Sequence, residues 1–436
     1  MSDSPPEAPS AGPATAAPEH GPTRPDPLDA TARSDGTGNR LWSRNFLLFF
    51  TARAVAKLGD TMLPVALSAG LIQQGHGAGA IGAVLASLSL FLAGFVIFGG
   101  VFCDRFNARA LMAGSDLVRV ATQTVAAVLF LSGNIVLWQI CVIGAINGIA
   151  GGMFEPGVAG TVPKVARDVQ GANGLIRTAE SLAMLAGPAL AGLLVALVSP
   201  GGVFAAHAGT YALSAVCLLL LRLPPDAPGG ARRQRTGYLT DLAEGWRHFR
   251  ARTWMWAVIV VWMVFMLTAW GPLVPLTAAE IVPTAGSGAY GLVNSALGAG
   301  TAAGGLLALR IRPLRQLRAG SAALLGCCCF PAAVGAGLPV WAMMGGAAVS
   351  GAGMGFWSVM WATSVQTQVP PEVLNRIHAL EVAGSLAMLP AGQALAGPAA
   401  GLLGSRQVLL VGGAMALLVA CTLLSVPAVR RLRRVV

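Results

Sequence analysis

Charged side chains are scarce in this chain of 436 residues. Only 11% of the residues are Asp, Glu, Lys or Arg, whereas 55% are hydrophobic. Soluble domains carry roughly 25% charged residues, so the composition argues against a large soluble enzyme. The sequence also contains no P-loop for ATP, no catalytic triad and no separate sensory domain. We therefore expect neither an enzyme nor an ATP-driven pump, and a sensor is disfavoured.

Cysteine patterns of known chemistry are also missing. The seven cysteines are odd in number, show no C-x-x-C spacing and lie almost entirely in apolar runs. Neither a disulfide framework nor a zinc site is predicted. Glycine, in contrast, is abundant at 56 residues. Small residues let helices approach closely in lipid, where the hydrophobic effect does not drive helices together.

Long apolar segments follow one another from residue 46 onward. Residues 1–40 are rich in proline and lack apolar periodicity, which predicts a disordered cytoplasmic tail. They contain no apolar run typical of a signal peptide. Beyond them, twelve segments are long enough to cross about 30 Å of hydrocarbon, which predicts an all-α membrane protein. These spans are 46–72, 79–102, 111–132, 136–162, 175–198, 202–222, 254–281, 286–309, 319–337, 339–363, 377–403 and 407–428.

Basic residues orient these spans. With the N-terminus in the cytoplasm, 25 of the 29 Lys and Arg residues fall on the cytoplasmic side. Only Arg406 falls outside, and Arg53, Lys57 and Arg119 lie within spans. The positive-inside rule therefore places both termini in the cytoplasm. The bias of Arg over Lys suggests a GC-rich bacterium, so we expect the protein in a bacterial plasma membrane. The net charge of +11 then reflects the topology of the protein in the membrane. We therefore expect the lipid bilayer as a partner and do not expect binding to nucleic acid.

The chain divides into two related halves. The sequence SLAML at 181–185 recurs at 385–389, GPALAG at 187–192 resembles GQALAG at 392–397, and a glycine pair at 99–100 recurs at 304–305. Because each half has six spans, the repeats are parallel and the halves can rock about a central cavity. We predict two pseudo-symmetric six-helix bundles at 41–222 and 254–430. A cytoplasmic linker at 223–253 joins them, and a basic tail follows at 431–436.

The loop between spans 2 and 3 contains Gly100-x-x-x-Asp104-Arg105, followed by Arg109. In this place the motif resembles a loop of the major facilitator superfamily. The resemblance covers about residues 41–430 and implies a twelve-helix fold. It also implies that this loop latches the two halves together in the outward-open state. Asp116 and Arg119, one turn apart on span 3, are expected to form a charge cluster with the latch. The alternative is that the loop arginines only follow the positive-inside rule.

Other segments resemble the exporter branch of this family, which includes enterobactin exporters and macrolide efflux pumps. They are residues 58–60, 115–119 and 368–372. In span 5, Gly187, Pro188 and Gly192 resemble the G-P-x-x-G-G signature of drug:proton antiporters, although Ala191 replaces one glycine. This resemblance implies export, and with it multidrug or antibiotic resistance. A kink that only serves helix packing is the alternative.

Ionisable residues inside spans are functional candidates because a charge is costly in lipid. Arg53, Lys57 and Asp60 share one face of span 1. We expect this face to line the cavity and Asp60 to carry the coupling proton. A static ion pair of Asp60 with either base is the alternative. Further candidates, which can instead stabilise helix N-termini, are Glu155, Glu180 and Glu381.

Aromatic side chains and one histidine within spans are candidates for lining a substrate cavity. Packing is the alternative for the histidine, and lipid contact at the membrane interface is the alternative for tryptophan. The candidates are His207, Tyr211, Trp262, Trp270, Phe356, Trp357 and Trp361.

Together these features predict a secondary transporter that exports an amphiphilic small molecule in exchange for protons by alternating access. A drug, an antibiotic or a siderophore-like natural product would fit. One charge that crosses 100 mV supplies ~2.3 kcal/mol, which supports a gradient of roughly fifty-fold at ~1.4 kcal/mol per tenfold. A proton-coupled uptake symporter of a small metabolite and a non-transporting membrane sensor are the alternatives. We expect a monomer with no metal and no cofactor besides the coupling proton.

Overall fold

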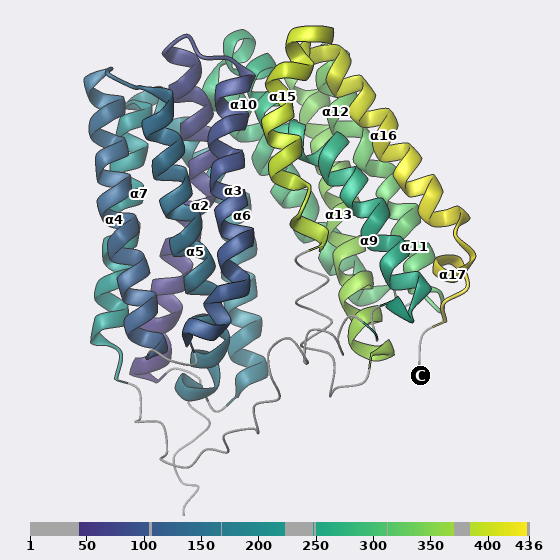
Figure 1. Cartoon of the computed structure of the whole chain (residues 1–436), viewed down its shortest axis with the longest axis horizontal. Coiled ribbons are helices and arrows are strands. Elements are labelled where there is room, and N and C mark those ends of the chain that lie inside the picture. Colours follow the sequence, from purple (N-terminus) through teal and green to yellow (C-terminus); the bar gives the residue numbers. More distant parts are fainter. Residues whose placement is uncertain are drawn as a thin grey trace, which may run out of the picture. The chain divides into compact units, whose positions relative to one another are not determined.

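A computed structural model describes residues 43–103, 107–166, 168–222, 247, 250–311, 313–369 and 384–433. Within these ranges the regular elements are helices and none is a strand (Figure 1). This confirms the predicted all-α class. The predicted tail at 1–40, most of the predicted linker at 223–253 and residues 434–436 lie outside the described residues.

Helices α2 to α7 form the N-terminal half. Polar side chains determine where several of them begin, because they accept hydrogen bonds from the first free N–H groups. Ser43 Oγ accepts from the Phe46 N–H and Ser199 Oγ from the Gly202 N–H, both at 3.1 Å. The helices are α2 (Arg44–Gln73), α3 (Ala78–Cys103), α4 (Ala108–Ser132), α5 (Leu137–Val165), α6 (Val169–Leu197) and α7 (Pro200–Leu220).

The C-terminal half departs from regular helix at two places. A π-helical segment interrupts its first span, and Gly286, with a φ of 85°, turns α10 back on itself. The Tyr290 hydroxyl therefore lies 3.4 Å from the Val274 carbonyl oxygen. In a straight helix these residues would be about 24 Å apart. The elements are α9 (Thr253–Phe265), η1 (Met266–Trp270), α10 (Gly271–Arg310), α11 (Gln316–Ala323), η2 (Leu324–Cys328), α12 (Cys329–Gly335), α13 (Val340–Gln368), α15 (Leu389–Leu403), α16 (Ser405–Ser425) and α17 (Pro427–Arg430).

Ten segments of the described chain are long and apolar enough to cross a membrane. One of them, Thr253–Arg310, has 58 residues, whereas a span needs about 20. Its turn at Gly286 divides it into two spans. Helix α13 is also long enough to cross, although it is not among the ten. The described helices thus accommodate the twelve predicted spans.

Hydrogen bonds identify the helix ends that lie together. Asn45, at the start of α2, donates to the Arg222 carbonyl just after α7 at 2.7 Å. In the C-terminal half, Gln368 at the end of α13 donates to the Arg433 carbonyl at 2.8 Å. We call this side of the molecule the arginine-rich end. Its described basic residues are Arg44, Arg109, Lys164, Arg177, Arg222, Arg247, Arg250, Arg252, Arg310, Arg315, Arg318, Arg430, Arg431 and Arg433.

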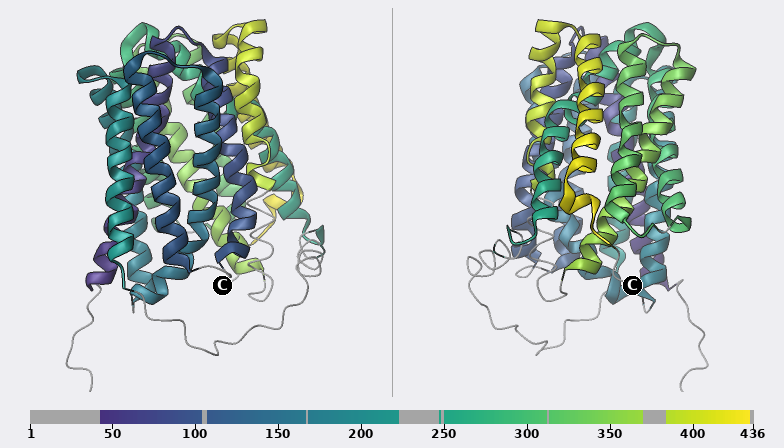
Figure 2. Two further views of the ribbon diagram at one scale, coloured as in Figure 1. Left: turned by 60° about the vertical axis from the view of Figure 1, so that its left-hand side comes forward. Right: turned by 90° about the vertical axis from the view of Figure 1, so that its right-hand side faces the viewer.

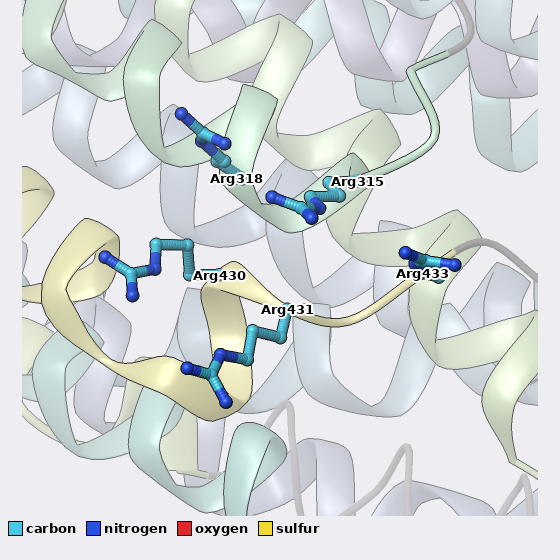
Figure 3. A pocket seen from close by; sticks show the side chains of 5 residues that line it. All are labelled: Arg315, Arg318, Arg430, Arg431 and Arg433. Carbon is cyan, nitrogen blue, oxygen red and sulfur yellow. The ribbon is translucent and has the colours of Figure 1, made fainter.

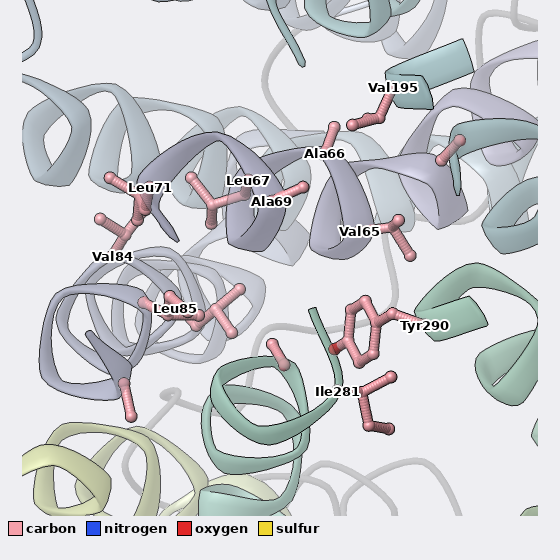
Figure 4. Packing of buried hydrophobic residues seen from close by; sticks show 14 of the residues in the cluster. Val65, Ala66, Leu67, Ala69, Leu71, Val84, Leu85, Val195, Ile281 and Tyr290 are labelled. Carbon is pink, nitrogen blue, oxygen red and sulfur yellow. The ribbon is translucent and has the colours of Figure 1, made fainter. Parts of the chain in front are cut away.

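The two halves meet at the opposite end. In Figure 2 the purple-to-teal helices and the green-to-yellow helices each form a bundle. One buried apolar cluster contains residues of both bundles, among them Leu85 of α3 and Ile281 and Tyr290 of α10 (Figure 4). Helices α3 and α15 approach so closely that a Cβ on Gly397 would overlap the backbone of Gly79. The other buried clusters of the described residues are each confined to one half. Contacts between the halves therefore close the end opposite the arginine-rich end.

Candidate transport site

Arg53 of α2 joins two glutamates from neighbouring helices. Its Nη2 lies 3.0 Å from Glu155 Oε1 on α5, and its Nε donates to Glu180 Oε1 on α6 at 3.0 Å. Arg177 Nη1, at 3.0 Å, neutralises the second oxygen of Glu180. Charges in a low-dielectric interior require such partners. The ion pair of Asp60 with Arg53 that the sequence left open is therefore not formed, because Arg53 turns to the two glutamates.

Asp60 contacts helix α7. The Tyr211 hydroxyl donates a hydrogen bond to Asp60 Oδ1, and His207 Nε2 lies 3.6 Å from the same oxygen. The His207 and Tyr211 rings lie 4.5 Å apart and are themselves buried. Gly59 makes this approach possible, since a Cβ there would overlap the His207 side chain. Lys57, one turn earlier on α2, is partly buried.

Asp116 and Arg119 of α4 complete the charged group. Arg119 Nη1 lies 3.7 Å from Asp116 Oδ1, and Ser214 Oγ donates to Asp116 Oδ2 at 2.6 Å. The Arg119 guanidinium lies 5.0 Å from the centre of the Tyr211 ring and 5.4 Å from that of Phe154. Tyr211 also contacts Asp60, and the Phe154 ring also faces Arg53. The Arg119 guanidinium therefore lies between the two groups of contacts. We call the whole set the charge cluster: Arg53, Asp60, Asp116, Arg119, Glu155, Glu180, His207, Tyr211 and Ser214.

The predicted latch is described only in part. Gly100 lies near the end of α3, whereas Asp104 and Arg105 fall outside the described residues. Arg109 Nη2 donates to the Leu219 carbonyl in the last turn of α7 at 2.7 Å. The negative end of the helix dipole also stabilises a cation at this position. Asp116 and Arg119 make their described polar side-chain contacts within the charge cluster. Glu381 also lies outside the described residues.

Tryptophans of α9 and α13 form a stack in the C-terminal half. Trp357 stacks on Trp262 at 5.7 Å and on Trp361 at 6.0 Å between ring centres. Trp254 meets Trp361 edge-on at 5.7 Å. Trp270 joins the stack through Phe265, which lies between it and Trp262. We call this set the tryptophan stack: Trp254, Trp262, Phe265, Trp270, Trp357 and Trp361.

Phe356, also a candidate for the cavity, faces elsewhere. It is buried with Ala308 and Met360 in a separate apolar cluster. The neighbouring Trp357 points into the stack, because consecutive residues of a helix lie about 100° apart around its axis.

The glycines of the span-5 motif serve close helix packing. A Cβ on Gly187 would overlap Thr61 of α2, and one on Gly192 would lie 2.7 Å from the Ser287 carbonyl oxygen of α10. Pro188 has no N–H for the Met184 carbonyl one turn earlier. That carbonyl lies directly against Gly298 of α10. This segment of α6 therefore forms part of the contact between the two halves.

Some residues of these groups were not among the sequence candidates. Ser214 continues the face of His207 and Tyr211 at the next helical turn, so the same spacing could have identified it. Phe154 and Trp254 had no such signal, since aromatic residues are frequent in spans. Ser89 of α3, which contacts Gln393 of α15 at 2.5 Å across the two halves, also carried no distinguishing pattern.

Comparison with known proteins agrees with this architecture. The family model of the Major Facilitator Superfamily matches residues 49–380. The uncharacterized MFS-type transporter YvqJ of Bacillus subtilis is 26% identical over 391 residues, covering 86% of this chain and 90% of that protein. Macrolide efflux protein A of Streptococcus pyogenes is 22% identical over 232 residues, 52% of this chain and 56% of that protein.

A crystal structure of the nucleoside transporter NupG has the same fold. It superimposes with a TM-score of 0.68 at 14% identity, covering 86% of this chain and 97% of that one. At this identity the likeness concerns the fold alone. The family match covers most of the chain, the helices adopt the corresponding fold, and the relatives include an MFS-type transporter and an efflux protein. This chain therefore belongs to the Major Facilitator Superfamily.

Proposed function

We propose that this transporter exports an amphiphilic small molecule in exchange for protons. The observation that carries the proposal is the setting of Asp60 in the charge cluster. Its side chain is 36% exposed, yet it faces Tyr211 and His207. A carboxylate that is both accessible and partnered inside a span can bind and release a proton. The similarity to macrolide efflux protein A supports export as the direction.

The closure between the halves supports access from the arginine-rich end. The positive-inside rule assigns that end to the cytoplasm of a bacterial cell. In this arrangement substrate enters the charge cluster from the cytoplasm, and the contacts of α3 with α15 and of α6 with α10 block its exit. Rocking of the two halves would then open the opposite end and release it outside.

Proton exchange at Asp60 couples these two states in the proposed cycle. Tyr211 donates to Asp60, which is the arrangement expected for an ionised carboxylate, because that form only accepts hydrogen bonds. In the proposed cycle Asp60 has released its proton to the cytoplasm in this state. In the outward-open state it takes up an external proton, which removes a negative charge beside Arg119 and Lys57. That change of charge favours the return to the present state.

Charge in one half and aromatic surface in the other support an amphiphilic substrate. Arg53, Glu180 and Trp262 each lie about 15 Å along their helices from the arginine-rich end, at 1.5 Å per residue. Glu155 is half exposed, and Trp262, Trp270 and Trp361 are partly exposed. A molecule with an ionic group and an apolar ring system could contact both. We propose that the monomer is sufficient for this activity.

Inverted membrane vesicles test the direction of transport. We expect vesicles that contain the protein to accumulate a macrolide or a fluorescent amphiphilic dye when respiration makes their interior acidic. An uncoupler should abolish this accumulation. Uptake into right-side-out vesicles instead would indicate the symporter. No movement in either preparation, of any dye or antibiotic in a broad panel, would favour the sensor.

Two tyrosine variants give this test a matched pair. Tyr211→Phe removes the hydroxyl that donates to Asp60, whereas Tyr290→Phe removes a buried hydroxyl at the closed end, 3.4 Å from a backbone carbonyl. We expect uncoupler-sensitive transport to fall in Tyr211→Phe and to persist in Tyr290→Phe. Equal activities would contradict a coupling role for the Tyr211–Asp60 contact.

A further inference from the structure

Five arginines surround a pocket at the arginine-rich end of the C-terminal half. Arg315 and Arg318 come from the beginning of α11, and the other three come from the chain end at and after α17 (Figure 3). The pocket has a volume of ≈ 460 Å³, and its lining residues are Arg315, Arg318, Arg430, Arg431 and Arg433. It lies apart from the charge cluster, which belongs to the N-terminal half.

The positive charge of this pocket is not offset by carboxylates of the described chain. Among the described residues, four other arginines have a carboxylate oxygen within 4 Å. None of the five pocket arginines has a described carboxylate at that distance. The four are Arg53, Arg119, Arg177 and Arg406. Arginine does not lose its proton under physiological conditions, so five like charges remain side by side. Such an arrangement is stabilised by a bound anion.

Arginine also indicates which anion fits. Its planar guanidinium matches two oxygens of a phosphate at once, which makes it the preferred side chain for phosphate recognition. Five guanidinium groups carry more positive charge than one phosphate group can neutralise. The pocket chemistry therefore fits a ligand that carries phosphate groups, and best one that carries two.

The surface beside the pocket distinguishes a lipid from a soluble phosphate. Helix α16 leads into α17 and exposes apolar residues along its length, among them Leu410, Leu417 and Leu418. Helix α9, which contacts α17, exposes Trp256 and Val260. Tryptophan in this position is typical of the headgroup level of a membrane. Acyl chains can therefore lie along α16 and α9 while a headgroup occupies the pocket.

We propose that the arginine pocket binds the headgroup of an anionic membrane phospholipid, most tightly a lipid with two phosphates. Basic pockets between helices on the cytoplasmic side are suited to such headgroups. The site is independent of the transported substrate. Lipid bound there ties the chain end to α11 and so stabilises the C-terminal half.

Lipid titration of the purified full-length protein tests this site. We expect cardiolipin to raise the thermal unfolding midpoint more than phosphatidylglycerol does, and phosphatidylcholine to have little effect. In Arg315→Gln/Arg318→Gln the apparent Kd for cardiolipin should rise about thirty-fold, from the attraction of two arginines to an anionic surface. The matched control is Arg44→Gln/Arg222→Gln, which removes the same charge from the same end in the other half and should retain the wild-type Kd.

Other outcomes would overturn the proposal. Equal cardiolipin affinity in the pocket and control variants would mean that lipid binds by net charge alone. Inorganic pyrophosphate that raises the midpoint as much as cardiolipin would mean that the pocket binds a soluble anion. Arg430→Gln/Arg431→Gln, on the opposite wall, provides a second pair should the α11 variant not fold, and the same loss of affinity is expected. Native mass spectrometry of retained lipids gives an independent measure.

Discussion

Replacing Gly397 with valine should open the closed end of the transporter. A Cβ at this position of α15 would overlap the backbone of Gly79 on α3, and backbone atoms cannot move aside as a flexible side chain does. Overpacking of this kind costs about 1–3 kcal/mol. In the outward-open state of the proposed cycle, α3 and α15 separate at this end, so the added methyl groups would cause no clash there. The equilibrium should therefore shift toward the outward-open state by roughly 5- to 150-fold.

Electron paramagnetic resonance can measure this shift. Spin labels on cysteines at Gly77 and Leu402, in a background without native cysteines, report the separation of α3 and α15 at the closed end. Both positions are exposed. We expect Gly397→Val to deplete the short distances and populate longer ones. A strongly reduced affinity for substrate offered from the arginine-rich side should accompany this change.

Gly401→Val is the control for this experiment. Gly401 lies one turn further along α15, and a Cβ there meets nothing within 4 Å. The same loss of glycine and the same β-branched side chain are thus introduced without a clash. If both variants gave the wild-type distance distribution, the contact between α3 and α15 would not hold the closed state.

Three further predictions follow from the charge cluster and the topology. Arg53→Gln should lower the free energy of unfolding by about 2 kcal/mol. This is less than the 3–5 kcal/mol typical of breaking a fully buried pair, because one of the two glutamates is half exposed. A thermal melt that matches the wild type would contradict the pairing. Gly59→Leu should disrupt the packing of α2 against His207 and abolish transport, whereas Gly209→Leu, where a Cβ meets nothing within 4 Å, should retain it. A cysteine at Ser199 should react with an impermeant reagent in intact cells and one at Gly230 should not; the reverse pattern would invert the topology.

Much of the fold could be predicted from the sequence because lipid imposes strict conditions on it. Apolar runs of about 20 residues must be helices there, and the predicted spans correspond to helices throughout the described chain. Helix α6 begins at Val169, earlier than the predicted 175, because Asp168 Oδ1 accepts the Gly171 N–H at 2.9 Å and caps a polar first turn. Hydropathy is insensitive to such a turn. The π-helical segment η1 also has no hydropathy signal.

The partners within the site could not be predicted. Arg53, Lys57 and Asp60 do share a face of α2, but seven residues span about 10 Å along a helix. Arg53 therefore reaches α5 and α6, whereas Asp60 reaches α7. Which neighbour lies at each depth depends on the rotation and packing of the other helices. The sequence pattern identifies the charged residues, and only the three-dimensional arrangement identifies their partners.

Uphill transport by Asp60→Asn in proteoliposomes is the most direct test of proton coupling. The variant keeps the size of the side chain and removes its titratable group. With an imposed pH gradient, we expect Asp60→Asn to lose uphill export of a macrolide or dye and substrate-driven proton release but to retain counterflow down a substrate gradient. Glu280→Gln is the matched control, since Glu280 is an acid in α10 that pairs with Arg406 at 2.9 Å, away from the charge cluster. Normal uphill pumping by Asp60→Asn, equal to that of Glu280→Gln, would contradict proton coupling through Asp60.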